Sequence, residues 1–424
     1  MTQLRNVTCD AAGSPARPDG QGAGGTRGAR PRSASVRRKA ALGSVAAIAV
    51  AATLAMPVST AWAQPDHDRA GYGRADLQRG LDDIVRKDGV VGAQATLVHG
   101  KHHSSVRSGT ADRDTGRPVP HQGYFRMGSN TKTFVSTVML QLVGEGRIRL
   151  DDTVDQWLHG VVDANGNDGR RITVRQLLQH TSGLPDYDES LPVTDEEEFQ
   201  KHRFDRYAPR DLVDMALRHR PLFEPGKGWS YSNTGYILAG MIIEKVTGRH
   251  WSDEVRERII EPLGLKHTFS AGTRTGLPQP HAKGYQQFKP GGRLVDSTEV
   301  SMTWGGSAGD LVTTSNDLTR FWQGLLGGKL LAPRQMAQML KTVPAPEASD
   351  KAVKEMGLGI FWTRLSCGGG YWGHGGTTLG HLNTNGFVDK GKKGVIVMRS
   401  TNLAAEDRDD RADRLVDTAL CAKK

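Results

Sequence analysis

Apolar and polar residues alternate with two different periods along this chain, and each period predicts its own kind of element. In residues 77–87 the apolar positions recur at helical spacing, whereas residues 92–99 alternate in the manner of a strand. Gly100 and Lys101 then form a hairpin turn into a second strand at residues 104–109. The pattern therefore predicts a helix followed by a pair of antiparallel strands.

Helix signals dominate the middle of the chain. Thr173 and Pro209 stand where helices begin, and Gly248 stands where one ends. The predicted helices occupy residues 174–180, 211–218, 236–246 and 251–260, the last of them ending at Pro262. This stretch is therefore expected to be helical throughout.

Strand patterns return in the last third of the chain. Residues 371–377, 382–388 and 394–399 are rich in strand-forming residues and are separated by glycine or by the turn at 389–394. Such spacing predicts consecutive antiparallel strands. A final helix is predicted at residues 411–422.

The predicted fold class is α+β. Strands at both ends of the chain, with helices between them, indicate one antiparallel sheet built from both termini and flanked by helices. We expect residues 64–424 to form one domain, with the sheet part at roughly 75–145 and 285–424 and an all-α insertion at roughly 146–284. A cleft between these two parts would be the place for a binding site.

Ser129 and Lys132 form the only Ser-x-x-Lys of the chain, and an apolar helical run begins directly behind them. A serine at a helix start lies near unpaired backbone N–H groups, and a lysine three residues on lies on the same face. A hydroxyl is a weak nucleophile unless a base takes its proton, and a lysine can be that base if its pKa is lowered. Ser129 is the candidate nucleophile and Lys132 its candidate base; the alternative is a chance motif.

Two further motifs follow in the chain. Tyr231 and Asn233 form its only Tyr-x-Asn, and His374 opens a His-Gly-Gly in a glycine-rich segment. His-x-Gly also occurs at residues 121–123, so the third motif alone is weak. The order Ser-x-x-Lys, Tyr-x-Asn, basic residue-x-Gly is that of penicillin-interacting serine enzymes, with Tyr and His as variants. The order favours the interpretation that the three motifs form one site over the interpretation that each occurs by chance.

The net charge does not indicate a nucleic acid partner. The formal charge is +10, but residues 1–63 carry eight Lys and Arg against two acidic residues, which leaves +4 for residues 64–424. No basic stripe with interleaved aromatic residues is present in the sequence. The charge is that of an ordinary protein surface.

Residues 1–63 are expected to be an export signal. Basic residues at 37–39 precede an alanine-rich apolar run at 40–56, and Ala61 and Ala63 supply a small-x-small cleavage site. The run is short for a membrane span, and no other stretch is long enough. We expect a secreted protein, cleaved after Ala63 and free of the membrane; twin arginines admit either the Tat or the Sec route.

The cysteines leave two interpretations open. Cys9 would be removed with the leader, which leaves Cys367 and Cys421 as an even pair in an oxidising compartment. One disulfide between the last helix and the sheet is expected; the alternative is two buried free thiols. The histidines show no metal-ligand spacing such as His-Glu-x-x-His, so no metal site is expected.

The chain resembles the serine penicillin-recognising superfamily, and most closely the soluble Streptomyces-type D-alanyl-D-alanine carboxypeptidases, relatives of class C β-lactamases. The segments that carry the resemblance are residues 125–129, 177–184, 231–236, 296–299, Trp304, 307–309, 357–359 and 365–367 with its late cysteine partner. They span nearly all of the mature chain. The resemblance implies a β-lactamase/transpeptidase-like fold and a serine hydrolase domain at 64–424.

The resemblance also implies roles for individual residues. Ser129 would form an acyl-enzyme, Lys132 would accept its proton, and Tyr231 would relay protons to the leaving group. The Asn233 amide would bind the substrate, and Trp304 would form an aromatic wall. His374 would be a hydrogen-bond donor and, when protonated, a positive charge. The backbone N–H groups of Thr377 and Ser129 would form an oxyanion hole. Tyr231, Trp304 and His374 could instead be ordinary core residues. No metal or cofactor is implied.

The implied activity is that of a monomeric D-alanyl-D-alanine carboxypeptidase that acts on peptidoglycan stem peptides and binds β-lactams. Two departures weaken the carboxylate site: Gly375 replaces a hydroxyl residue, and Phe361 stands where the carboxypeptidases have an arginine, although Arg364 is close by. Weaker discrimination for a free carboxylate follows. A class C-like β-lactamase, an esterase or a D-amino-acid amidase is the alternative, and a non-catalytic β-lactam or cell-wall binding module is the alternative from another class.

Overall fold

The computed structural model describes residues 72–346, 354–404 and 411–422. The expected export signal and its cleavage site lie outside these residues. None of the helices in the described ranges is long and apolar enough to cross a membrane.

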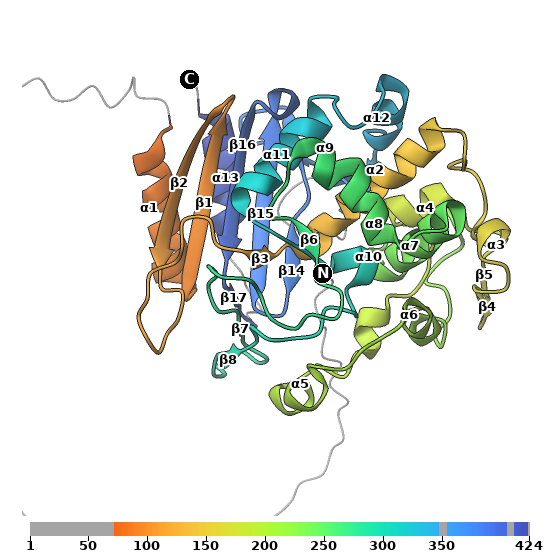
Figure 1. The fold of residues 1–424 in the computed structure, drawn as a ribbon, viewed down its shortest axis with the longest axis horizontal. Coiled ribbons are helices and arrows are strands. Elements are labelled where there is room, and N and C mark those ends of the chain that lie inside the picture. Colours follow the sequence, from red (N-terminus) through yellow and green to blue (C-terminus); the bar gives the residue numbers. More distant parts are fainter. Residues whose placement is uncertain (1–71, 347–353, 405–410, 423–424) are drawn as a thin grey trace, which may run out of the picture. The chain divides into compact units, whose positions relative to one another are not determined.

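A nine-stranded antiparallel sheet forms the centre of the described chain (Figure 1). Its order is β10-β11-β12-β13-β15-β16-β1-β2, with β14 paired to β15. The strands are β1 (Gly92–His99), β2 (His102–Gly109), β10 (Val343–Pro344), β11 (Lys354–Met356), β12 (Phe361–Arg364), β13 (Gly370–Gly373), β14 (Gly376–Thr378), β15 (His381–Val388) and β16 (Lys393–Arg399). The predicted α+β class and the sheet built from both ends of the chain are confirmed.

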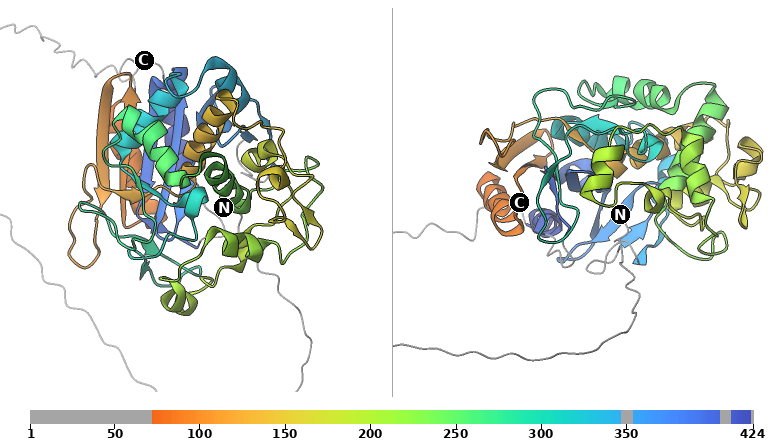
Figure 2. Two further views of the ribbon diagram at one scale, coloured as in Figure 1. Left: turned by 45° about the vertical axis from the view of Figure 1, so that its right-hand side comes forward. Right: turned by 90° about the horizontal axis from the view of Figure 1, so that it is seen from below.

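Side chains of β16 alternate between two cores because successive residues of a strand face opposite sides. Val395 and Val397 pack with residues of α1 (Arg74–Asp88) and α13 (Arg411–Cys421), which cover one face of the sheet (Figure 2). Ile396 and Met398 join the core on the other face, where α11 (Ser315–Leu326) lies. Each such side chain contributes ~1.5–3 kcal/mol when fully buried, so the strand is held from both sides.

The helical stretch in the middle of the chain contains short helices packed around α7. These elements are α3 (Val154–Trp157), α4 (Val174–Gln179), α5 (Glu196–His202), α6 (Pro209–Ala216), α7 (Asn233–Thr247), α8 (Trp251–Val255), the π-helical turn η3 (Arg256–Ile260) and α9 (Glu261–Leu263). The helical run ends at Leu263, one residue beyond the predicted end at Pro262, and Gly264 is its C-cap. Pro262 falls in the first turn of α9, where a missing N–H is tolerated.

Short elements connect the sheet to the helices. The remaining helices are α10 (Gly306–Gly309) and α12 (Pro333–Met339), with 3-10 turns η1 (Gly128–Asn130), η2 (Tyr187–Ser190) and η5 (Asp389–Gly391). The small sheets are β3 (Phe125–Arg126), β9 (Leu311–Thr313) and β6 (Phe269–Ser270); β17 (Thr401–Asn402), β7 (Tyr285–Gln286) and β8 (Val295–Asp296); and β4 (Asp163–Ala164) with β5 (Asn167–Asp168). β3 leads directly into η1 and α2 (Thr131–Gly144), which together carry the Ser-x-x-Lys motif.

The strand predicted at residues 371–377 is broken in two, which corrects the sequence interpretation. β13 ends at Gly373 and β14 begins at Gly376, so His374 and Gly375 lie between strands. The amide of Asn385 replaces the sheet ladder there, because its Oδ1 accepts from the His374 N–H at 3.3 Å and its Nδ2 donates to the His374 carbonyl at 2.8 Å. The break places His374 at the end of a strand rather than within one.

A disulfide connects the turn after β12 to the end of α13. The Sγ atoms of Cys367 and Cys421 are bonded, and their Cα atoms are 5.7 Å apart. The Ser366 N–H and hydroxyl also bind the Asp417 carboxylate. The last helix is therefore attached to the sheet by both covalent and polar contacts.

Candidate active site

The nucleophile turn, residues 127–132, brings Ser129 and Lys132 into contact. Ser129 lies in η1 and Lys132 is the second residue of α2. Because these positions are three residues apart on one helical path, the Lys132 Nζ reaches the Ser129 Oγ at 3.0 Å. The pairing predicted from sequence spacing is therefore present in the structure.

Lys132 is completely buried and has three acceptors. Besides Ser129 Oγ, its Nζ contacts Asn233 Oδ1 at 2.6 Å and the Ala308 carbonyl at 2.8 Å. Burial lowers the pKa of Lys132 to about 7, although the carboxylates of Asp186 and Asp188 oppose this shift. An amine with this pKa is neutral in a large fraction of molecules at pH 7 and can accept a proton from Ser129.

Tyr231 lies over Lys132 and against Ser129. The Lys132 Nζ is 4.9 Å from the centre of the Tyr231 ring, and the nearby Ser129 side chain opposes the rise in the pKa of the phenol. The ring stacks on His180 with centroids 4.3 Å apart, and His180 Nδ1 accepts from the Ser232 N–H at 3.1 Å. Burial raises the pKa of Tyr231 well above its ordinary value, so the phenol is neutral.

Asn233 is engaged by protein groups at every polar position of its side chain. Its Oδ1 accepts from Lys132, while its Nδ2 donates to Asp186 Oδ2 at 3.0 Å and to Asp188 Oδ2 at 2.7 Å. An amide nitrogen has two hydrogens, and both are used. Holding a substrate amide, the role implied by the resemblance, stays a prediction that would require one of these contacts to be exchanged.

His374 is neutral and presents an acceptor. Its Nδ1 lies 2.7 Å from the Gly375 carbonyl and must carry the hydrogen, so Nε2 holds a lone pair; that atom is buried and has no partner among the described residues. Burial and the charge of Lys132 lower the pKa of His374 to about 3. The positive charge expected of His374 is therefore absent at neutral pH.

An aromatic ring lies beside the His374 imidazole. The Phe361 ring lies 5.1 Å from the imidazole, between centroids. The sequence position of Arg364 suggests that it replaces a carboxylate-binding arginine. In the structure Arg364 lies at the far end of β12, opposite Gly370 in the register of the sheet, and is exposed. Since residues 361 and 364 face opposite sides of the strand, Arg364 does not share the Phe361 face.

β14 packs directly against the nucleophile turn. Gly128 has φ +52°, and a Cβ placed on it would come 2.9 Å from the Thr377 nitrogen and 2.8 Å from its oxygen. A Cβ on Gly376 would come 1.9 Å from the Met127 carbonyl. Glycine at both positions therefore allows the backbones of Ser129 and Thr377 to approach each other, as an oxyanion hole made from their N–H groups requires.

Trp304 contacts Tyr187 through its backbone and two hydrophobic clusters through its ring. Its carbonyl accepts from the Tyr187 hydroxyl at 2.6 Å, and its partly buried ring packs between two hydrophobic clusters. Its role as an aromatic wall stays a prediction.

Three asparagines that the sequence did not single out join the nucleophile turn to the third motif. Asn130, next to Ser129, donates to Asn383 Oδ1 and accepts from Asn385 Nδ2 at 3.0 Å. Asn385 in turn holds the backbone of His374. Asp186 and Asp188 were missed as well, and their only sequence signal is their position directly after the 177–184 segment.

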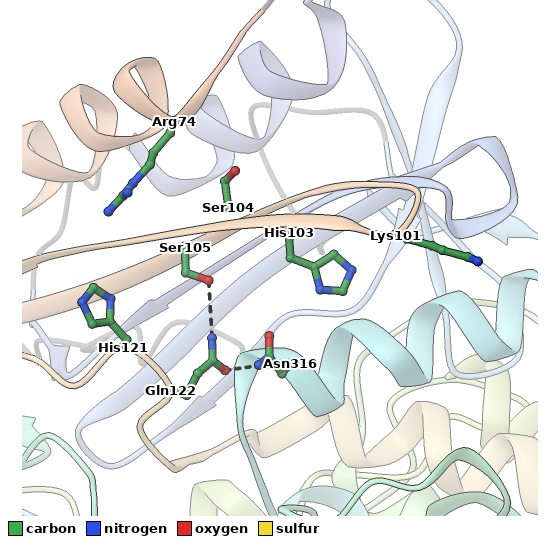
Figure 3. Close-up of a pocket in the computed structure, with 8 residues that line it drawn as sticks. All are labelled: Arg74, Lys101, His103, Ser104, Ser105, His121, Gln122 and Asn316. Atoms are coloured by element: carbon green, nitrogen blue, oxygen red, sulfur yellow. Dashed lines mark hydrogen bonds between the residues drawn. The ribbon is translucent and has the colours of Figure 1, made fainter.

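A surface hollow of the described chain lies away from these residues. It measures about 620 Å³ and is lined by residues of α1, β2, the start of α11 and the 121–122 loop (Figure 3). None of the predicted catalytic residues lines it. Within the described ranges no group of His, Cys, Asp and Glu is arranged to hold a metal ion.

Comparison with known proteins gives one family and several solved structures. The family model described as Beta-lactamase matches residues 77–420. A D-stereospecific amidohydrolase from Streptomyces sp. is 39% identical, with a TM-score of 0.73, over 79% of this chain and 96% of that chain. A D-amino acid amidase from Ochrobactrum anthropi SV3, solved with L-phenylalanine amide, is 31% identical, with a TM-score of 0.71, over 81% and 96%.

Curated relatives include penicillin-binding proteins. Penicillin-binding protein 4 of Amycolatopsis lactamdurans is 28% identical over 76% of this chain and 80% of that protein. Penicillin-binding protein 4* of Bacillus subtilis is 34% identical over 39% of this chain. The match covers 34% of that relative, about a third of its length.

Proposed function

We propose, from the premise that this chain belongs to the beta-lactamase family of serine hydrolases, that it cleaves amides of D-amino acids through an acyl-enzyme on Ser129. The observation that carries the proposal is the 3.0 Å contact between a buried lysine amine and the serine hydroxyl. The pKa of about 7 at Lys132 makes that amine a base near neutral pH.

The proposed reaction has two halves. Lys132 takes the Ser129 proton as Oγ attacks the substrate carbonyl, and the backbone N–H groups of Ser129 and Thr377 receive the developing oxyanion. Tyr231, whose phenol lies near Ser129, gives its proton to the leaving nitrogen as the C–N bond breaks and recovers one from Lys132. Water then attacks the ester carbonyl along the same proton path, which releases the acid and restores Ser129.

The third motif favours an uncharged leaving group. A free carboxylate there would meet a neutral His374 and the Phe361 ring, and neither side chain supplies a positive charge. An amide or amine leaving group carries N–H donors that the His374 Nε2 lone pair can accept. The named activities of the Streptomyces and Ochrobactrum structures support the same substrate class.

D-Alanyl-D-alanine carboxypeptidase activity on cell-wall peptides is the second candidate, and similarity to the penicillin-binding proteins supports it. It would use the same acyl-enzyme and would form a slowly hydrolysed one with β-lactams. Export and cleavage near Ala63 are part of this proposal, since peptidoglycan lies outside the cytoplasm. An esterase or a β-lactamase would share the chemistry, whereas a non-catalytic module would not.

A labelling experiment tests the mechanism. A fluorophosphonate probe is expected to label the purified protein on Ser129, and Ser129→Ala is expected to abolish labelling with the fold retained by circular dichroism. Absence of label on the wild type would refute the serine mechanism. Ligand binding that is unchanged in Ser129→Ala, without turnover, would support the non-catalytic module instead.

A substrate panel then separates the candidates. We expect the highest kcat/KM with D-phenylalanine amide and little with the L-enantiomer. A D-Ala-D-Ala peptide, nitrocefin and a p-nitrophenyl ester represent the carboxypeptidase, β-lactamase and esterase alternatives. If the protein turns over one of these three substrates fastest, the corresponding activity replaces the amidase assignment.

A further inference from the structure

We propose that Asp186 and Asp188 are positioning residues for acylation: together they hold the Asn233 amide with its oxygen toward Lys132, and Asp186 supplies the negative charge that faces the lysine. The proposal rests on the proposed function, because it concerns the base of that reaction. Neither residue contacts Ser129 in the structure, so both would act through Asn233.

The orientation of the amide follows from its partners. Asn233 is the first residue of α7, and its side chain lies between Lys132 on one side and the two carboxylates on the other. Carboxylate oxygens accept hydrogen bonds, so they select the NH2 end of the amide and leave the carbonyl end for the lysine. An apolar group in their place would permit the amide to rotate and would direct N–H groups at the Lys132 amine.

The two carboxyl groups differ in their partners. Asp186 Oδ2 accepts from the Asn233 backbone N–H and from its Nδ2, both at 3.0 Å, and Asp186 Oδ1 accepts from the Asp188 N–H at 3.2 Å. Asp188 receives only the Asn233 Nδ2, and its Oδ1 is buried without a partner among the described residues. Three donors favour the ionised form at Asp186, whereas the bare oxygen suits a proton at Asp188.

The electrostatics agree with this division. Burial, followed by the charge of Asp186, raises the pKa of Asp188 to about 8. Burial also raises the pKa of Asp186, but the N–H groups of Asn233 and Asp188 oppose that shift. Two like charges so close together are not both retained away from water, so one proton on Asp188 leaves Asp186 as the anion near pH 7.

The remaining titratable groups near Lys132 stay neutral in the working pH range. They are Tyr231 and Tyr236, whose ring centres lie 4.9 and 5.5 Å from Nζ, and the imidazoles of His180 and His374. Burial raises the pKa of both tyrosines and lowers that of both histidines. The carboxyl pair is therefore the charge that faces Lys132 across Asn233.

The test is the pH dependence of Ser129 labelling by an uncharged fluorophosphonate, from pH 5 to pH 9, with the full-length protein. In the wild type the rate should rise through an acid limb as Lys132 loses its proton. Asp188→Asn imitates the protonated carboxyl, so its limb should stay at the wild-type pH. Asp186→Asn with Asp188→Asn leaves no carboxylate and should move the limb down by about one unit.

The magnitude makes the shift measurable. At a pH below the limb, a shift of one unit makes the double variant label about tenfold faster than the wild type, because more of its lysine is neutral. Above the limb it should label more slowly, because a less basic amine removes the serine proton less well. Glu189→Gln, at an exposed neighbour in η2, is the matched control and should leave the limb in place.

The outcomes separate this proposal from the one it rests on. A wild type that is not labelled refutes the serine hydrolase itself. A folded double variant with the wild-type limb, at full or at uniformly reduced rate, refutes the role of the carboxylates. If the double variant does not fold, Asp186→Asn with Asp188→Ala, which also leaves no carboxylate, takes its place, and an unshifted limb in that folded variant refutes the role of the carboxylates equally.

Discussion

A histidine that does not take a second proton changes what the His-Gly-Gly motif at residues 374–376 can bind. His374 donates from Nδ1 to the Gly375 carbonyl and leaves Nε2 bare, in a place where burial lowers the pKa to about 3. A residue that a sequence comparison counts as basic therefore behaves as a neutral acceptor. At the residue scale, the proposed substrate class rests on this distinction between a charge and a hydrogen-bond acceptor.

His374→Lys should restore affinity for a free carboxylate. A charge-assisted hydrogen bond contributes ~1.5–3 kcal/mol, so the ratio of kcat/KM for D-Phe-D-Ala to that for its carboxamide should rise about tenfold. His374→Gln, which stays neutral, should leave the ratio near the wild-type value. Equal ratios in all three proteins would show that this side chain does not sense the leaving group.

The sequence predicted the residues that are close in the chain and missed those that act across it. Ser129 and Lys132 are three positions apart on one helix, so spacing alone brings them together. Asp186 and Asp188 reach Asn233 from 47 and 45 positions away, and that amide lies between them and Lys132. No local pattern encodes such a contact, because it depends on where η2 packs against α7.

At the scale of elements, the approach of β14 to the nucleophile turn is a backbone contact without room for a side chain. Gly376→Ala should reduce the labelling rate at Ser129 at least about a hundredfold, since its Cβ would meet the Met127 carbonyl and the displaced N–H of Thr377 could no longer serve the oxyanion. Gly375→Ala is the control, because its nearest contact would be 3.2 Å, to the Asn383 carbonyl. Equal rates in the two variants would contradict this account of β14.

Periodicity predicted most elements but not their interruptions. The pattern at 371–377 reads as one strand, yet the Asn385 side chain takes the place of the ladder at His374. The short strands at 343–364 carry no alternation that a sequence could reveal, and their neighbours in the sheet define them. Breaks and edges depend on tertiary partners, so these were the parts that sequence could not supply.

At the scale of the whole molecule, the link between Cys367 and Cys421 closes a loop across a sequence separation of 54. Removing it with Cys421→Ser should lower the free energy of unfolding by about 2–4 kcal/mol, measured by chemical denaturation. Cys367→Ser and the double variant should lose the same amount, since all three remove one bond. A reductant should affect only the wild type, and additive losses would argue against a shared bond.

Buried neutral histidines should make the fold sensitive to acid. Burial lowers the pKa of His374 and of His381 to about 3, below the ordinary value of 6.5, so the unfolded chain binds protons that the folded chain excludes. Their contribution is fully present above pH 6.5 and is lost as the pH falls toward 3. Each should remove about 2 kcal/mol of unfolding free energy by pH 5.

The matched comparison uses one histidine outside the candidate site. Denaturation curves at pH 7 and pH 5 should differ less for His381→Gln than for the wild type, by about 2 kcal/mol. His121→Gln, at an exposed position, should leave the difference unchanged. An unaltered difference in His381→Gln would show that acid acts through other groups.

The register of β1 has a consequence for biosynthesis. Ala93 lies opposite Arg399, so a ribosome delivers this strand among the first parts of the domain and its central neighbour among the last. Throughout most of translation β1 can pair with β2, which follows it directly, but lacks β16, its other neighbour in the sheet. A polypeptide that terminates before β16 therefore lacks the strand that joins β15 to β1, even if its catalytic residues have already been synthesised.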